Sequence, residues 1–194
     1  MSRLDIKNNR FIFFYYVLLF FLLSFAGWLW EVMIYLVRDG NFVNRGVLTG
    51  PWLPVYGAGG VLLSLLSGKA SGKPVRVFVI SLTVCSVLEY LASWYLETYW
   101  GVRWWDYTGS FLNLNGRICL AGSLMFGVGG VLLVCLAGPF LKKHFLKICA
   151  GNGGRKAVLL ICAILLFLFI ADAAWAADFP NMGKDITYRG ASWT

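Results

Sequence analysis

Long apolar runs alternate with short polar stretches along the chain. The runs end at charged residues or at glycine and proline, and each is too long and too continuous to be a strand. A transmembrane helix needs roughly 20 consecutive, mainly apolar residues. We therefore predict an all-α polytopic membrane protein with five transmembrane helices, at about residues 11–37, 52–67, 75–100, 118–141 and 157–177.

The second of these runs is the least regular. It is short and rich in glycine, so the helix can be tilted or broken, or can begin as early as Val47. The composition supports the membrane class, because 59% of the residues are hydrophobic and only 13% are charged.

Lys and Arg residues alternate in number between successive polar segments. The N-terminal tail has 3, the four loops have 2, 3, 2 and 5, and the C-terminal tail has 2. Because cytoplasmic segments carry the excess of Lys and Arg, we expect the N-terminus in the cytoplasm and the C-terminus outside. The net charge of +8 is then explained by this orientation and by contact with the lipid bilayer. No nucleic-acid partner is required.

Two halves of the chain are similar in sequence. AGWLWE at 26–31 matches ASWYLE at 92–97, and GAGGVLL at 57–63 matches GVGGVLL at 127–133. We predict two parallel-repeat helical hairpins, related by an axis along the membrane normal, with a binding site at their interface. Chance similarity between apolar segments is the alternative. The glycines of each half predict faces on which helices approach closely.

This repeat divides the chain into three parts. A duplicated four-helix membrane core is expected first, followed by a basic cytoplasmic linker and then by a fifth transmembrane helix with an outer C-terminal tail. The expected limits are 1–141 for the core, with repeat A at about 11–67 and repeat B at about 75–141, then 142–156 for the linker and 157–194 for the last part.

One acidic residue lies deep in an apolar run. Glu89 is 13 residues beyond Arg76, which is about 20 Å along a helix. An ionised acid near the bilayer centre costs about 3 kcal/mol. Glu89 should therefore have a partner or be protonated. It belongs to a stripe of polar residues at helical spacing, with Ser86, Ser93 and Glu97, which should face the bundle.

Glu31 and Glu97 occupy matching positions at the outer ends of two helices. Arg45 and Arg117, at equivalent places in the two outer loops, are their natural counter-charges. The simpler alternative is that both glutamates are interfacial residues in contact with water.

The outer loops concentrate side chains that can hydrogen-bond a polar small molecule or a lipid headgroup. Several of their tryptophans can alternatively form an interfacial aromatic belt. A belt needs only aromatic residues, however, whereas these loops also supply amide, guanidinium, carboxylate and phenol groups. The candidates are Asn44, Arg45 and Tyr56 from the first half and Trp104, Trp105, Asp106, Tyr107, Asn113, Asn115 and Arg117 from the second.

The sequence predicts neither a metal site nor a cofactor. Its five cysteines lie in or beside apolar segments without CxxC spacing, and its one histidine, His144, lies in the basic segment KKHFLK. SGKASGKPV departs from a P-loop, because Pro74 stands where Ser or Thr should bind magnesium. An ABC system built on this chain would therefore need a separate ATPase or other membrane subunit.

Four segments carry a family resemblance. WLWEV, FVNRGVLTGPWLPVYG, LEYLASWYLE and RWWDYTGSFLNLNGRICL resemble the CmpB-like group of bacterial membrane proteins, labelled as type IV ABC-transporter permeases. The resemblance covers about residues 24–140 and leaves the basic linker and the fifth helix outside. It implies a multi-pass protein of the bacterial cytoplasmic membrane with a permease-like role.

Three functions are open at this point. The first is a transport component with a polar, outward-facing site and Glu89 as a proton or cation relay. The second is a membrane-embedded enzyme or lipid-handling protein at the outer leaflet, with acids as general acid or base and arginines binding a phosphate or carboxylate. The third is a membrane assembly or regulatory protein whose outer loops dock another protein.

Overall fold

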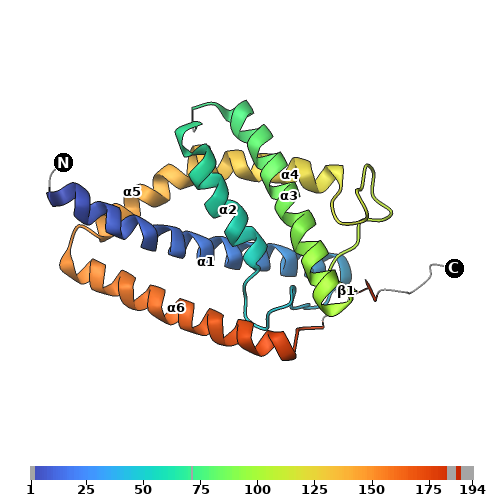
Figure 1. Ribbon diagram of the computed structural model, residues 1–194. Coiled ribbons are helices and arrows are strands. Elements are labelled where there is room, and N and C mark those ends of the chain that lie inside the picture. The colour runs from blue at the N-terminus through green and yellow to red at the C-terminus, as the bar shows by residue number, and fades with distance from the viewer. Residues whose placement is uncertain (1–2, 71, 183–186, 189–194) are drawn as a thin grey trace.

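The computed structural model is helical along most of its length (Figure 1). It describes residues 3–70, 72–182 and 187–188, with side chains described for 11–68, 70 and 72–182. A two-residue strand pair is the only sheet in these residues. The elements are α1 (Arg3–Asp39), α2 (Pro54–Ser67), the 3₁₀ turn η1 (Gly68–Ala70), α3 (Pro74–Trp100), β1 (Val102–Arg103), α4 (Leu120–Val131), the π-helix η2 (Leu132–Ala137), α5 (Gly138–Ile148), α6 (Asn152–Asp178) and β2 (Thr187–Tyr188).

The all-helical membrane architecture expected from the sequence is confirmed, with one short helix. Four helical segments are long and apolar enough to cross a membrane. The second predicted span, α2, has only 14 residues, or about 21 Å, against a hydrocarbon core of about 30 Å. The four long segments are Phe11–Asp39, Pro74–Trp100, Leu120–Ile148 and Asn152–Asp178.

α4, η2 and α5 form one continuous helix that passes through a proline. Pro139 has no N–H, and its ring would collide with the carbonyl of an ordinary preceding turn. The wider π turns of η2 directly before it accommodate the ring, and Gly138 N–H bonds to the Leu133 carbonyl there. The helix therefore continues to Ile148, so that residues 142–148, expected in the basic linker, are helical.

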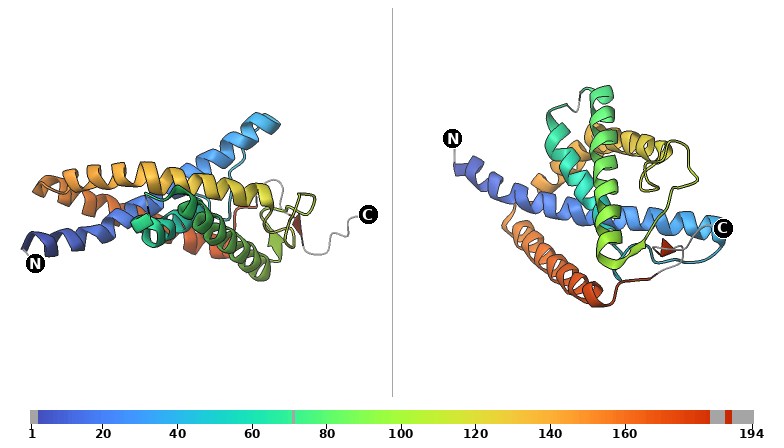
Figure 2. Two further views of the ribbon diagram at one scale, coloured as in Figure 1. Left: turned by 90° about the horizontal axis from the view of Figure 1, so that it is seen from above. Right: turned by 45° about the vertical axis from the view of Figure 1, so that its right-hand side comes forward.

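The two ends of the molecule differ in character. The C-terminal ends of α1, α3 and α6 and the start of α4 gather at one end, with the loops 40–53 and 101–119 (Figures 1 and 2). We call this the loop end. The opposite end holds the turn between α5 and α6 with the nearby basic residues Lys142, Lys143, Lys147, Arg155 and Lys156, and we call it the basic end.

α3 presents polar residues to the protein and apolar residues outward. Apart from Val77, its buried residues are Ser81, Ser86, Glu89, Ser93 and Glu97. The exposed face carries large apolar side chains, among them Val79, Val87, Leu91 and Trp94. This inverted pattern suits a helix surrounded by lipid, and it confirms that the predicted polar stripe faces the bundle.

Glycines bring the helices of each half into close contact, as the sequence predicts. A Cβ on Gly57 of α2 would collide with the Ser24 side chain of α1, and one on Gly127 of α4 would collide with Phe78 of α3. The contact registers differ, however. If the two halves packed alike, Gly127 would contact Tyr90, which the alignment of AGWLWE with ASWYLE places at the position of Ser24. Phe78, the residue that Gly127 does approach, lies 12 residues, or about 18 Å, from Tyr90 along α3.

Candidate functional site

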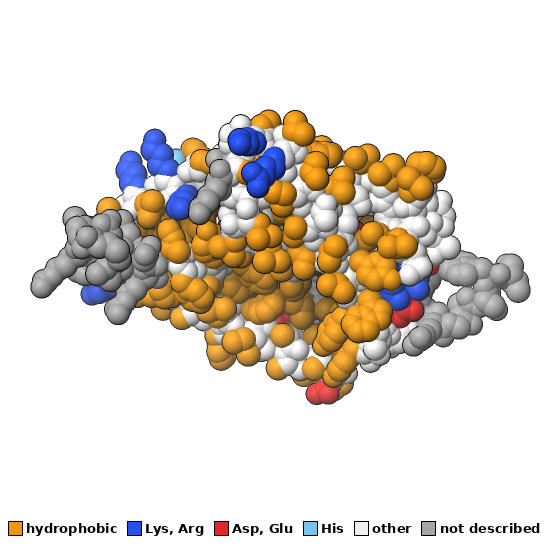
Figure 3. Space-filling model, turned by 45° about the horizontal axis from the view of Figure 1, so that its top comes forward, with side chains coloured by type: hydrophobic (Ala, Val, Ile, Leu, Met, Phe, Trp, Pro, Cys, Tyr) orange, Lys and Arg blue, Asp and Glu red, His pale blue; other side chains and the backbone are white. Residues whose placement is uncertain are grey.

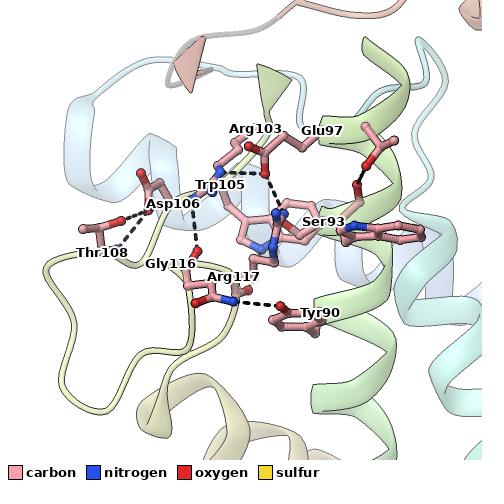
Figure 4. A network of polar contacts seen from close by, with 12 residues as sticks. Tyr90, Ser93, Glu97, Arg103, Trp105, Asp106, Thr108, Gly116 and Arg117 are labelled. Atoms are coloured by element: carbon pink, nitrogen blue, oxygen red, sulfur yellow. Dashed lines mark hydrogen bonds and ion pairs between the residues drawn. The ribbon is translucent and has the colours of Figure 1, made fainter. Parts of the chain in front are cut away.

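The polar side chains of the second half form an ion-pair network at the loop end. Glu97 Oε2 accepts Arg117 Nη1 at 2.7 Å and Arg103 Nε at 2.9 Å (Figure 4). The side chains of Glu97 and Arg117 are each only 11% exposed. Arg117 also donates to Ser93 Oγ at 3.3 Å and lies over the Tyr90 ring. The predicted pairing of Glu97 with Arg117 is therefore present, with Arg103 as a further partner.

A matching pair joins α1 to the loop 40–53. Arg45 Nε lies 3.5 Å from Glu31 Oε2, as the sequence predicted, and the guanidinium lies over the Tyr35 ring. Arg45 Nη2 also donates to the Trp104 carbonyl at 2.9 Å. This bond links the loop 40–53 to the loop 101–119.

Several predicted site residues shape the second loop itself. The Asn113 amide nitrogen donates to the Thr108 and Ser110 carbonyls, and its oxygen accepts the Gly116 N–H. Asp106 accepts the Thr108 N–H at 2.9 Å. Asn115 adopts a left-handed backbone with φ of 53°, which asparagine tolerates better than most residues, and donates to the Tyr90 hydroxyl.

The tryptophans of the loop are hydrogen-bonded inside the protein. Trp104 is 3% exposed and donates from Nε1 to the Asn181 carbonyl. Trp105 donates to the Arg117 carbonyl, and Trp28 donates to Asn44 Oδ1 at 2.6 Å. Trp94, by contrast, is 51% exposed, as expected for a residue of the aromatic belt. The belt interpretation therefore fits Trp94 but not the buried Trp104.

Glu89 has a hydrogen-bond partner among the described residues for only one of its two carboxylate oxygens. It is 8% exposed, and its Oε1 accepts the Tyr107 hydroxyl at 3.1 Å. Its Oε2 is buried without a hydrogen-bond partner among the described residues. Within the described part of the chain, no Lys, Arg or His nitrogen forms an ion pair with Glu89. The partner expected for Glu89 is thus the Tyr107 phenol, which contacts one carboxylate oxygen. The other oxygen has no hydrogen-bond partner among the described residues.

A second phenol and acid pair lies close to the first. The Tyr56 hydroxyl of α2 donates to Glu31 Oε1 of α1 at 2.7 Å. Burial raises the pKa of the Tyr107 phenol above its usual range, and the nearby carboxylates of Glu89 and Glu31 raise it further. Tyr107 therefore lies in the field of both acids, between the two halves of the chain.

Two residues that the sequence pattern did not single out tie α6 and the segment after it to the loop end. Asp172 accepts the N–H groups of Thr49 and Gly50 and Trp52 Nε1, the last at 2.7 Å. Asn181 donates to the Asn44 and Gly46 carbonyls and accepts Trp104 Nε1. The available signal was a lone acid within the apolar run 157–177.

Metal ligands are not grouped in the described residues. No set of three or more His, Cys, Asp or Glu side chains there could hold a metal ion. The cysteines that the structure describes are all free thiols. The chemistry of the site is accordingly that of carboxylates, phenols and guanidinium groups.

Comparison with known proteins identifies one family. The model of the family described as "Putative ABC-transporter type IV" matches residues 18–177. The match includes the basic segment and nearly all of α6, which corrects the expectation that the family resemblance ends near residue 140. No curated protein and no solved structure matches the chain.

Proposed function

The chain belongs to the "Putative ABC-transporter type IV" family, and we propose that it is a permease-like membrane transport component with a polar binding site at the loop end. The proposal places the site between two helical hairpins, α1 with α2 and α3 with α4. In this arrangement α2 returns the chain across the membrane, and the loop end faces outward. Energy for transport would come from a separate ATPase subunit.

The observation that carries the proposal is the unpaired buried oxygen of Glu89. Acidic groups inside membrane-spanning helices are costly and typically mark pathways for ions or substrates. Tyr107 covers one carboxylate oxygen from the loop, while the other has no partner among the described residues. A site of this kind is ready to accept a hydrogen-bond donor, a proton or a positively charged group.

The geometry favours transport over the enzymatic alternative. An enzyme or lipid-handling protein of the kind considered above needs arginines available to bind a phosphate or carboxylate. Arg45, Arg103 and Arg117 instead each pair with a glutamate. Their ion pairs brace the outer loops around Glu89, which is the role expected of a scaffold that holds a site.

Complementation of cells that lack the chain tests the proposal. Cells carrying the wild-type chain, Glu89→Gln, Arg117→Ala or the control Thr83→Ala are compared for their content of small solutes. Thr83 lies on the exposed face of α3, where it bonds only to its own helix. We expect Glu89→Gln and Arg117→Ala to abolish the solute difference that the wild type restores, at unchanged membrane levels. Full activity of both variants would refute the proposal.

A further inference from the structure

An apolar groove of about 390 Å³ lies between α1, α2 and α6. It is lined by Phe13, Val17 and Phe20 of α1, Ala58 and Leu62 of α2, and Leu166 of α6, among others. All three helices are apolar, and α1 and α6 are long enough to span the membrane. The groove therefore opens at the level of the hydrocarbon core, and it belongs to the half of α1 nearer the basic end.

The course of α2 creates this groove. Gly57 and Gly60 hold α2 against Phe20, Leu23 and Ser24 of α1. Beyond these glycines α2 departs from α1 (Figure 1), and Leu63 packs instead with Val77 and Val134. The first turns of α1 inside the membrane are consequently left uncovered by α2.

Leu166, which lines the groove, and the basic residue Arg155 lie on the same face of α6. Cys162 Sγ contacts the Phe14 carbonyl and the Phe169 ring contacts Phe20, so this face packs on α1. Arg155 precedes Leu166 by 11 residues, which is just over three helical turns and about 16 Å. That distance is close to half of the roughly 30 Å hydrocarbon thickness.

The described residues leave part of the hydrogen-bonding capacity of Arg155 unfilled. Its Nε donates to the Cys149 carbonyl at 2.6 Å, and its guanidinium lies over the Phe11 ring. Its two terminal amino groups make no hydrogen bond to residues that the structure describes. Lys156 is exposed beside it, and Lys147 is exposed at the end of α5. Figure 3 shows apolar side chains over most of the visible face, with Lys and Arg side chains toward its edges.

We propose that the groove binds an acyl chain of an anionic phospholipid from the leaflet at the basic end, with the lipid phosphate held by Arg155 and Lys156. An arginine offers a phosphate two parallel N–H donors, and each basic residue near a membrane surface attracts anionic lipid. The apolar lining fits the chain, and the 16 Å between Leu166 and Arg155 fits the span from mid-bilayer to headgroup. This lipid site is independent of the transport site at the loop end.

Native mass spectrometry of the purified full chain tests the proposal, with phosphatidylglycerol and phosphatidylcholine of identical acyl chains as probes. We expect phosphatidylglycerol to bind the wild type roughly 25-fold more tightly, at about fivefold for each of the two basic residues. Arg155→Gln with Lys156→Gln should remove this preference. Ala58→Phe should weaken the binding of both lipids, because the larger side chain fills the groove. Lys73→Gln with Arg76→Gln and the outward-facing Leu160→Trp are the matched controls, and both should bind as the wild type does.

Three results would overturn the proposal. The first is equal affinity of the wild type for the two lipids, and the second is a preference that survives the Arg155 and Lys156 substitutions. The third is a photoreactive group at Leu62 that crosslinks to a partner protein and not to lipid. Salt dependence of the wild type provides a check that needs no variant, because added salt should weaken only phosphatidylglycerol binding.

Discussion

The Tyr107 hydroxyl lies 3.1 Å from Glu89 Oε1, so a residue of the loop 101–119 contacts an acid of α3, a helix long and apolar enough to cross a membrane. The contact joins a segment fixed by Asn113, Asp106 and Trp105 to the polar face of α3. A movement of the loop 101–119 that withdraws Tyr107 would remove this hydrogen bond from Glu89. The pair therefore has the geometry of a gate in the proposed transport site.

Burial of Tyr107 predicts an unusual alkaline titration. A free tyrosine ionises near pH 10, whereas burial and the adjacent acids raise the pKa of Tyr107. The folded wild type and Tyr107→Phe should thus show equal tyrosinate absorbance around pH 10 to 11. In denaturant they should differ by one tyrosine. An extra tyrosine titrating in the folded wild type near pH 10 would contradict the burial.

The same shift has a defined sign for stability. Because the folded-state pKa of Tyr107 exceeds the unfolded value of about 10, its contribution to the free energy of unfolding is complete below that pH. The contribution is lost as the pH rises toward the folded-state pKa, by up to about 1.4 kcal/mol per pH unit. Unfolding midpoints in detergent should accordingly fall more steeply above pH 10 for the wild type than for Tyr107→Phe.

Glu97→Gln should destabilise the loop end. The substitution removes the charge that pairs with Arg117 and Arg103 and leaves the largely buried Arg117 without a counter-charge. We expect a loss of about 3 kcal/mol in the free energy of unfolding, measured by thermal denaturation in detergent. Thr98→Ala, on the exposed face next to it, should change stability by less than about 0.5 kcal/mol.

The two arginines of this network, Arg103 and Arg117, should contribute differently to the free energy of unfolding. Arg103 is 24% exposed and Arg117 is 11% exposed, so water compensates for the loss of the Arg103 pair more effectively. Arg117→Gln should therefore cost more stability than Arg103→Gln. The reverse order would show that burial does not set the strength of these ion pairs.

Asp172→Asn should loosen the loop 40–53. Asp172 accepts three N–H groups, from Thr49, Gly50 and Trp52, and an amide oxygen replaces only part of that capacity. A loss of about 1.5–3 kcal/mol is expected, with faster hydrogen exchange at the amides of Thr49 and Gly50. Asp178→Asn, at the exposed last residue of α6, is the matched control and should leave both measurements unchanged.

Apolar periodicity predicted much of the fold and polar spacing predicted much of the site. The polar stripe Ser86, Glu89, Ser93 and Glu97 follows helical spacing, so the buried face of α3 could be predicted without coordinates. Opposite charges at matched positions also predicted the Glu31–Arg45 and Glu97–Arg117 pairs. Both inferences rest on the high cost of leaving a charge unpaired in or near lipid.

What the sequence could not predict depends on contacts between distant segments. Asp172 accepts hydrogen bonds from a loop 120 to 123 residues earlier in the chain, and no local pattern links the two. The extension of α5 to Ile148 depends on where helices pack and where water begins, which hydropathy alone does not determine. The contacts of Gly57 with Ser24 and of Gly127 with Phe78 likewise depend on how the helices pack, which the sequence match does not specify.

Gly129 and Gly130 provide a test of helix packing at adjacent positions. A Cβ on Gly130 would collide with the fully buried Ser81 of α3, whereas a Cβ on Gly129 would meet nothing within 4 Å. Gly130→Ala should therefore cost about 1–3 kcal/mol in the free energy of unfolding. Gly129→Ala should stabilise the protein by about 0.5–1 kcal/mol, because alanine loses less backbone entropy in a helix. Thermal denaturation in one detergent compares the two directly, and equal effects of both would show that α4 does not approach α3 through Gly130.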